Sequence, residues 1–432
     1  MELSLGCARK RTAVAILASA IAAILIFEAG ETWLANRRID SGRLALMKRG
    51  AALLPGDGEA WDRVGRFLQF DFANPNPSAA IEDYRKAVRD DPRSSYYWMD
   101  LAGAYEDVGD TAHARQAFER AEAEYPASAL VAWNYGNFLL RQRENTKGYQ
   151  KIRQAVHIDP KLLPLAISRT WLSSADASVL ISQVLPASVE AYLQALTFLA
   201  SIHEPDAGLV VWKQLVALGK PFELARTFPF LDELIANDEA ELAARVWREA
   251  IAGDGLHPGE SSADSLIWNG DFSRDFANGG LGWRWDSPIG VSISFDSPPP
   301  SEKGRSVRLD FGGGSNLALD APTEYVPVEP SHAYHFHAYL RTEDVATESG
   351  IQLSIIDPNH RGAVNVVTDN LTGTHSWAAV DADVRTGEET HFLLVRLFRS
   401  PSRLFDNKLS GTAWIADVSL VPSNLEAKGS LQ

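Results

Sequence analysis

The chain has 432 residues, 45% of them hydrophobic and 22% charged, which is enough for two or three domains with buried cores. Its formal net charge of -15 makes nucleic acid, itself a polyanion, an unfavourable partner. The single cysteine, Cys7, excludes a disulfide or a thiolate metal cluster within these residues.

The amino-terminal segment has the pattern of an export signal or membrane anchor. Arg9, Lys10 and Arg11 precede an uncharged run from Thr12 to Phe27, and positive flanks stay on the cytoplasmic side. Residues 29–34 extend this run towards the roughly 17–25 residues that a span needs. We predict a cytoplasmic tail at 1–11 and an uncleaved transmembrane anchor at 12–35. The protein would then be a single-pass protein of the bacterial inner membrane, with its bulk outside the cytoplasm. The alternatives are a cleaved signal peptide and a buried core helix.

A repeat follows. Pro92, Pro126 and Pro160 are spaced by 34 residues each time, which is the period of the tetratricopeptide repeat. Small and large residues recur at fixed places before each proline; in the middle copy they are Trp98, Leu101, Ala102, Tyr105, Ala114, Phe118 and Ala121. Over residues 58–160 the sequence therefore resembles tetratricopeptide repeat proteins. The resemblance implies stacked helical hairpins, whose concave face usually binds a partner protein or peptide.

The helical pattern continues in weaker form on both sides of these repeats. Segment 42–54 fits the second helix of a leading copy, and apolar spacing predicts helices at 187–202, 206–218, 222–236 and 238–252. We predict an α-solenoid over 42–252, with degenerate pairs from 161 to 252. The alternative is that the repeat aromatics are only core residues and no partner binds. A Gly/Ser/Asp-rich linker is expected at 253–264.

Alternating β-type runs follow the linker, which makes this a multidomain chain, α then β. The runs at 291–295, 306–311, 334–340, 351–356, 391–398 and 413–421 are separated by turn residues. Regular short strands of this kind indicate a β-sandwich over 265–422, followed by a tail at 423–432.

The β-region resembles carbohydrate-binding modules of the galactose-binding-like jelly-roll type. The resemblance rests on the opening residues 266–272 with Trp283, on the turn 371–374 with Trp377, and on the closing residues 411–420. It implies a structural calcium held by the opening and closing strands, where Asp271 and Asp417 supply the hard oxygen ligands that calcium requires. The alternative is an ordinary pair of turn and strand-end aspartates. We expect no other cofactor.

Strand alternation selects candidates for glycan binding. Tyr334, Phe336, Ala338 and Leu340 fall on one face of their strand, and the residues between them fall on the other. Sugars need aromatic stacking and polar groups, and the candidate set is Trp285, His335, His337, Tyr339, Gln352 and Arg396. A solvated sheet face is the alternative, and zinc at His335 and His337 has no third ligand nearby apart from His332. Trp283, Trp377 and Trp414 are interpreted as core.

The sequence contains no recognisable catalytic signature, such as a nucleophile elbow, a phosphate loop, a dinucleotide fingerprint or an HExxH pattern. We therefore expect a non-enzymatic envelope adaptor that binds protein through its repeats and glycan through its sandwich, with a role in the assembly or export of exopolysaccharide or another cell-surface polysaccharide. A purely structural interaction scaffold is the second hypothesis. A cryptic polysaccharide hydrolase is the third, because a carboxylate pair is set by folded geometry rather than by sequence.

Overall fold

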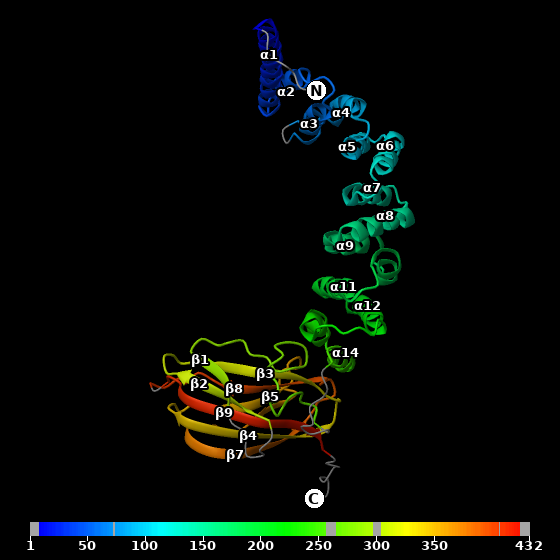
Figure 1. Cartoon of the computed structure of the whole chain (residues 1–432). Helices are drawn as coiled ribbons and strands as arrows, with labels where there is room; N and C mark the ends of the chain where they lie inside the picture. The colour runs from blue at the N-terminus through cyan, green and yellow to red at the C-terminus, as the bar shows by residue number, and fades with distance from the viewer. Residues whose placement is uncertain (1–7, 72–73, 256–264, 297–303, 406, 424–432) are drawn as a thin grey trace, which may run out of the picture. The chain divides into compact units, whose positions relative to one another are not determined.

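The computed structural model describes residues 8–71, 74–255, 265–296, 304–405 and 407–423 (Figure 1). Cys7, most of the expected linker and nearly all of the expected tail lie outside these ranges. Contacts divide the chain into two compact units. The first comprises Met1–Ala175 with Val179–Pro186, and the second comprises Asp176–Ser178 with Ala187–Gln432.

The first unit begins with α1 (Ala8–Ile39), which is long and apolar enough to cross a membrane. Its described side chains are exposed until Ala35, which is fully buried. From that point α1 packs on α2 (Leu44–Ala51), where a Cβ on Gly50 would come within 2.6 Å of the Ala35 carbonyl oxygen. The end of α1 is thus the first helix of the leading pair, and the helix is unbroken between its exposed and packed parts.

Three helix pairs follow, in the positions that the repeat predicts. They are α3 (Gly58–Phe70) with α4 (Pro77–Asp90), α5 (Ser95–Asp107) with α6 (Thr111–Glu124), and α7 (Ala129–Arg141) with α8 (Asn145–Ile158). Each repeat proline lies just after a second helix, where the missing N–H costs no helical hydrogen bond. The side chains of Asp57 and Ser128 accept N–H groups at the helix starts. The helical half is therefore tetratricopeptide-like.

The helices continue through the 3₁₀ turn η1 (Pro160–Leu162), α9 (Leu163–Ser174), α10 (Ala177–Val179) and the π-helical turn η2 (Leu180–Val184). The second unit holds α11 (Val189–Ser201), α12 (Pro205–Ala217), η3 (Leu224–Thr227), α13 (Phe228–Ala236) and α14 (Ala240–Gly253). These bounds match the helices expected from apolar spacing within a few residues, except that the first part of 222–236 is a loop and a 3₁₀ turn. Trp212 of α12 is buried against Phe222 and Phe230.

The carboxyl-terminal part of the second unit consists of two antiparallel sheets (Figure 1). One has the order β1-β2-β9-β4-β7, and the other β3-β8-β5-β6. The strands are β1 (Val291–Asp296), β2 (Ser306–Gly312), β3 (Leu319–Pro327), β4 (Ala333–Val345), β5 (Gln352–Ile356), β6 (Asn365–Val367), β7 (Gly373–Arg385), β8 (Phe392–Arg399) and β9 (Ser410–Pro422). Buried residues of both sheets form one hydrophobic core, so the sheets pack face to face.

Two of the three tryptophans interpreted as core residues lie elsewhere. Trp283 is fully buried in the shared core, as expected. Trp377 is only half-buried on the edge strand β7 and takes no part in the core. Trp414 is buried, but on the outer face of the five-stranded sheet, because its β9 neighbours Ala413 and Ile415 are the residues that point into the core.

Candidate functional site

The outer face of β4 carries the histidine and tyrosine candidates together. Burial alternates along β4, so Tyr334 and Phe336 point inward while His335, His337 and Tyr339 point outward. His335 Nδ1 lies 3.0 Å from an Asp383 oxygen, and His337 Nδ1 lies 2.7 Å from Asp381, both on the adjacent β7. These partners orient the two imidazoles on the solvent side of the sheet.

The hydrogen bonds of these pairs shift two pKa values in opposite directions. The hydrogen bond to Asp383 raises the pKa of His335, and Asp381 adds to the effect. The hydrogen bond from His337 lowers the pKa of Asp381. The His337 and Tyr339 rings meet edge to face with centroids 5.0 Å apart. This outer face of the sheet therefore presents aromatic rings next to paired imidazole and carboxylate groups, which can donate and accept hydrogen bonds.

Trp414 extends this polar and aromatic face across β9. It pairs with Arg308 on β2 and with Arg341 on β4, and directly opposed residues share a face of the sheet. The guanidinium of Arg341 lies 4.2 Å from the Trp414 ring centroid, that of Arg308 lies 5.3 Å away, and the indole N–H donates to Asp296. Sequence alternation could not locate this residue, because the run Ala413–Ala416 is apolar at every position.

Gln352 and Arg396 do not join this face. They lie on β5 and β8 of the four-stranded sheet, whereas His335, His337 and Tyr339 lie on the five-stranded sheet. Arg396 makes a two-oxygen contact with Asp320 at 2.8 and 2.9 Å, and Gln352 donates to the Thr368 carbonyl. The expectation that alternation would place all five residues together is wrong, because alternation cannot tell which sheet a strand enters.

Trp285 is not a free stacking platform. Its ring is half-buried and packs against the shared core, and its backbone N–H donates to the Asn278 side chain at 2.9 Å. The preceding residue, Arg284, forms a β-bridge with Thr323 of β3, so this segment adjoins the four-stranded sheet. The nearby exposed apolar side chain is Ile289, which is 93% exposed.

The expected calcium ligands lie on adjoining segments. The Gly270 carbonyl accepts the Val418 N–H at 2.9 Å, so the residue before Asp271 is hydrogen-bonded to the residue after Asp417. Asp271 Oδ1 accepts the Ser273 N–H, while Asp417 Oδ2 is buried with no hydrogen-bond partner. Within the described part of the chain, no group of three or more His, Cys, Asp or Glu side chains is arranged to hold a metal. A cation bound between these two segments would satisfy the unpaired Asp417 oxygen.

The last helices pack directly on the base of the sheets. A Cβ on Gly279 would lie 2.2 Å from the Phe228 ring, so only glycine allows this close approach. The side chain of Asp232 accepts the Gly280 N–H at 3.1 Å and contacts Arg284 at 2.6 Å. The α13–α14 turn is tied by Asp238, which contacts His391 at 2.8 Å and accepts from Asn359 at 2.7 Å.

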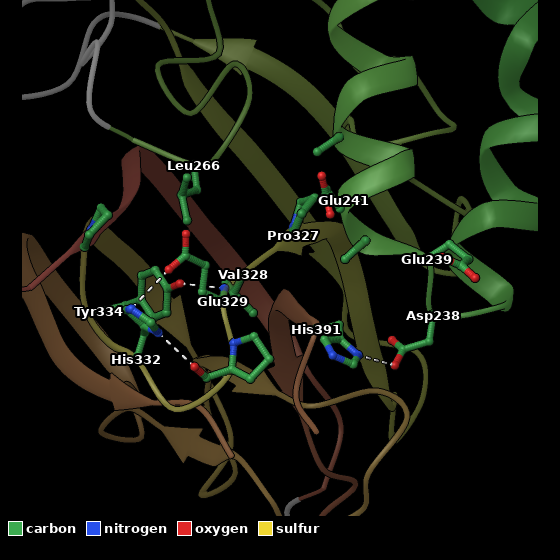
Figure 2. Close-up of a pocket in the computed structure, with 14 residues that line it drawn as sticks. Asp238, Glu239, Glu241, Leu266, Pro327, Val328, Glu329, His332, Tyr334 and His391 are labelled. Atoms are coloured by element: carbon green, nitrogen blue, oxygen red, sulfur yellow. Dashed lines mark hydrogen bonds and ion pairs between the residues drawn. The ribbon is translucent and has the colours of Figure 1, made fainter. Parts of the chain in front are cut away.

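Beside this contact lies a pocket of about 690 Å³, which sequence analysis did not anticipate (Figure 2). The start of α14 contributes Glu239 and Glu241, and the β3–β4 connection contributes Glu329 and His332. Glu329 contacts His332 at 3.0 Å, and the backbone N–H of Glu329 donates to the Tyr334 hydroxyl. The lining comes from segments far apart in the chain, so no local motif could reveal it.

The first unit carries a periodic row of exposed apolar side chains. Tyr96 of α5 and Leu130 of α7 stand at equivalent repeat positions, and Leu165 of α9 follows one residue later than the period. They are 50%, 45% and 55% exposed. Core packing does not account for side chains that remain this exposed in successive repeats. We name Tyr96, Leu130 and Leu165 the apolar row.

Comparisons with known proteins identify no family. No family model matches the chain, and no curated protein matches it. The crystal structure of MamA is similar over 40% of this chain and 85% of its own, with 17% identity and a TM-score of 0.26. The enzymatically active domain of bacteriophage CBA120 tailspike protein 4 is similar over 39% of this chain and 22% of its own, with 14% identity and a TM-score of 0.29.

Proposed function

We propose that this protein is a non-catalytic adaptor of the bacterial envelope. The anchor α1 holds it in the inner membrane, the tetratricopeptide-type pairs bind a protein partner, and the β-sandwich binds glycan. Assembly or export of an exopolysaccharide or another cell-surface polysaccharide suits this combination. The observation that carries the proposal is the apolar row. Its exposed side chains come from successive repeats of a unit that begins with a helix of membrane-spanning length.

The orientation follows from charge. Arg9, Lys10 and Arg11 flank the apolar part of α1, so the amino terminus stays cytoplasmic and the rest of the chain lies outside the cytoplasm. The net charge of -15 disfavours nucleic acid as a partner and suits neutral or cationic ones.

A photo-crosslinking residue tests the protein partner. We expect adducts in cells when it replaces Leu130, in the apolar row, and none when it replaces Glu82, an exposed residue of α4 outside it. Adducts of equal yield at both positions, or at neither, would contradict the assignment of the row.

The glycan half rests on the outer face of the five-stranded sheet and on the jelly-roll resemblance. His337, Tyr339 and Trp414 give this face both polar groups and aromatic surface. We expect the His337→Ala/Tyr339→Ala double variant of the full chain in detergent to lose binding to an envelope polysaccharide. Arg396→Ala, on the other sheet, is the control. Equal loss in both variants would reject the face.

A purely structural scaffold is the second candidate. The packing of Trp268, Gly279 and Arg284 on the last helices favours it, because the sheets then serve to complete the helical stack. Retention of glycan binding in the Arg396→Ala control would speak against this candidate. A polysaccharide hydrolase would instead be detected by substrate turnover.

A structural calcium at Asp271 and Asp417 belongs to the proposal as well. The cation would satisfy the buried Asp417 oxygen, so chelation should lower the melting temperature of the full chain. Asp417→Asn should abolish the difference between chelated and calcium-loaded protein. An unchanged melting temperature in the unmodified chain would remove calcium from the proposal.

A further inference from the structure

Acceptors outnumber donors in the pocket beside α14. Its carboxylates are Asp238, Glu239, Glu241 and Glu329, against the side chains of two histidines and one tyrosine. Asp238 is engaged by His391 and Asn359, and Glu329 is engaged by His332. The side chains of Glu239 and Glu241 are exposed, and among the described residues neither has a hydrogen-bond or ion-pair partner. A ligand that supplies positive charge and N–H donors would complement this lining.

Part of the pocket lining is apolar and stiff. Leu266 and three prolines, Pro327, Pro330 and Pro422, belong to this part, and the proline rings present C–H surface that cannot rearrange freely. A ligand with a flat face of C–H groups fits such a surface. The volume lies in the range of small-molecule sites, and an extended amine would leave most of it unfilled.

Tyr334 adds a buried donor. Its side chain is 3% exposed, and its hydroxyl accepts the Glu329 N–H at 2.7 Å. A phenol both accepts and donates, so its own hydrogen is left to point at a ligand oxygen. Burial raises the pKa of Tyr334, which keeps that hydrogen in place at neutral pH.

We propose that this pocket binds an amino sugar, a hexosamine unit whose amino group is free rather than acetylated. The ammonium lies against Glu239 and Glu241, the C–H face of the ring lies on the prolines, and a hydroxyl accepts from Tyr334. The site is separate from the outer face of the five-stranded sheet, so either site can fail without the other.

The test is calorimetric titration of the full chain in detergent with the disaccharide of glucosamine. We expect binding to fall about tenfold in the Glu239→Gln/Glu241→Gln variant, since a hydrogen bond to a charged group is lost. The N,N′-diacetylated disaccharide should bind about tenfold more weakly to the unmodified chain for the same reason. Tyr334→Phe should weaken binding without altering the preference for the free amine.

Two controls make the test decisive. Glu82→Gln/Glu204→Gln removes the same charge from exposed positions outside the pocket and should leave affinity unchanged. Equal weakening there would show a bulk charge effect and overturn the site. Absence of binding, equal binding of the acetylated disaccharide, or equal binding of spermidine would also overturn it. Loss in His337→Ala/Tyr339→Ala but not in the pocket variant would reject the pocket and leave the outer face standing.

Discussion

The indole ring of Trp247 on α14 meets the indole ring of Trp268, which precedes β1, edge to face, with centroids 5.4 Å apart. These residues stand on opposite sides of the segment 256–264, which the structure does not describe. Trp247 is also 6.4 Å from the ring of Phe228. The contact shows why the last helices and the two sheets fall in one compact unit.

Gly280→Ala should weaken this packing. Gly280 has a φ of +56°, and a Cβ there would lie 2.6 Å from the Trp247 ring. We expect unfolding free energy to fall by about 1–3 kcal/mol from the clash, beyond the backbone strain, in denaturant titration of the full chain. Gly290→Ala is the control. Gly290 has a φ of +86° and no neighbouring atom within 4 Å, so this variant introduces backbone strain without a clash. Equal losses in the two variants would show that the contact with Trp247 contributes nothing.

Asp62 should make stability depend on pH. Burial, and then the neighbouring Asp100, raise the pKa of Asp62 to about 7. Its carboxyl therefore holds a proton more tightly in the folded chain than in the unfolded chain. The stabilisation is complete below pH 4 and is lost as pH rises towards 7.

Asp62→Asn removes that dependence and should raise stability at neutral pH by roughly 1–3 kcal/mol. Melting temperatures measured from pH 4.5 to 8 check this, with the exposed Glu82→Gln as the control. If the unmodified chain and Asp62→Asn showed parallel pH profiles, Asp62 would not be the titrating group.

The seam between α1 and α2 should depend on Gly50. A Cβ at this position meets the Ala35 carbonyl oxygen at 2.6 Å and Ile39 at 3.0 Å. Gly50→Val should separate the two helices at a cost of about 1–3 kcal/mol, visible as faster amide hydrogen exchange in 35–51. Gly30→Val, where no atom lies within 4 Å, should leave exchange unchanged. Protection that survives Gly50→Val would disprove close packing at the seam.

His335 should lose its raised pKa when its partner is removed. The side chain of Asp383 is the main cause of the shift, so Asp383→Asn should move the pKa of His335 down. Histidine NMR titration of the full chain measures this directly. Since both side chains are exposed, stability should change by less than about 1 kcal/mol. Asp310→Asn, on β2, should leave the titration unaffected.

The helical half could be predicted because its signals are local. Pro92, Pro126 and Pro160 mark helix ends, and helices that pack pairwise repeat the same small and large positions. The strands of the two sheets are harder to predict from the sequence. The edge strand β7 pairs on one side only and carries polar or small residues at most positions, so it has no strong apolar alternation. The proline at 322 similarly obscures β3.

The candidate site could be predicted only along single strands. Alternation placed His335, His337 and Tyr339 on one face of β4, as the structure has them. It could not place Gln352 and Arg396, because strand order is decided by long-range pairing. The pocket depends on His391 meeting Asp238 across more than a hundred residues of sequence, and no periodicity encodes such a contact.

The unbroken course of α1 has a mechanical consequence. Between Phe27 and Ala35 the helix rises only about 12 Å, with no hinge glycine pair or proline along that stretch. In the proposed orientation, the leading helix pair is therefore held close to the lipid headgroups, in rigid continuity with the anchor helix. Any tilt or rotation of α1 in the bilayer must turn the first helix pair with it.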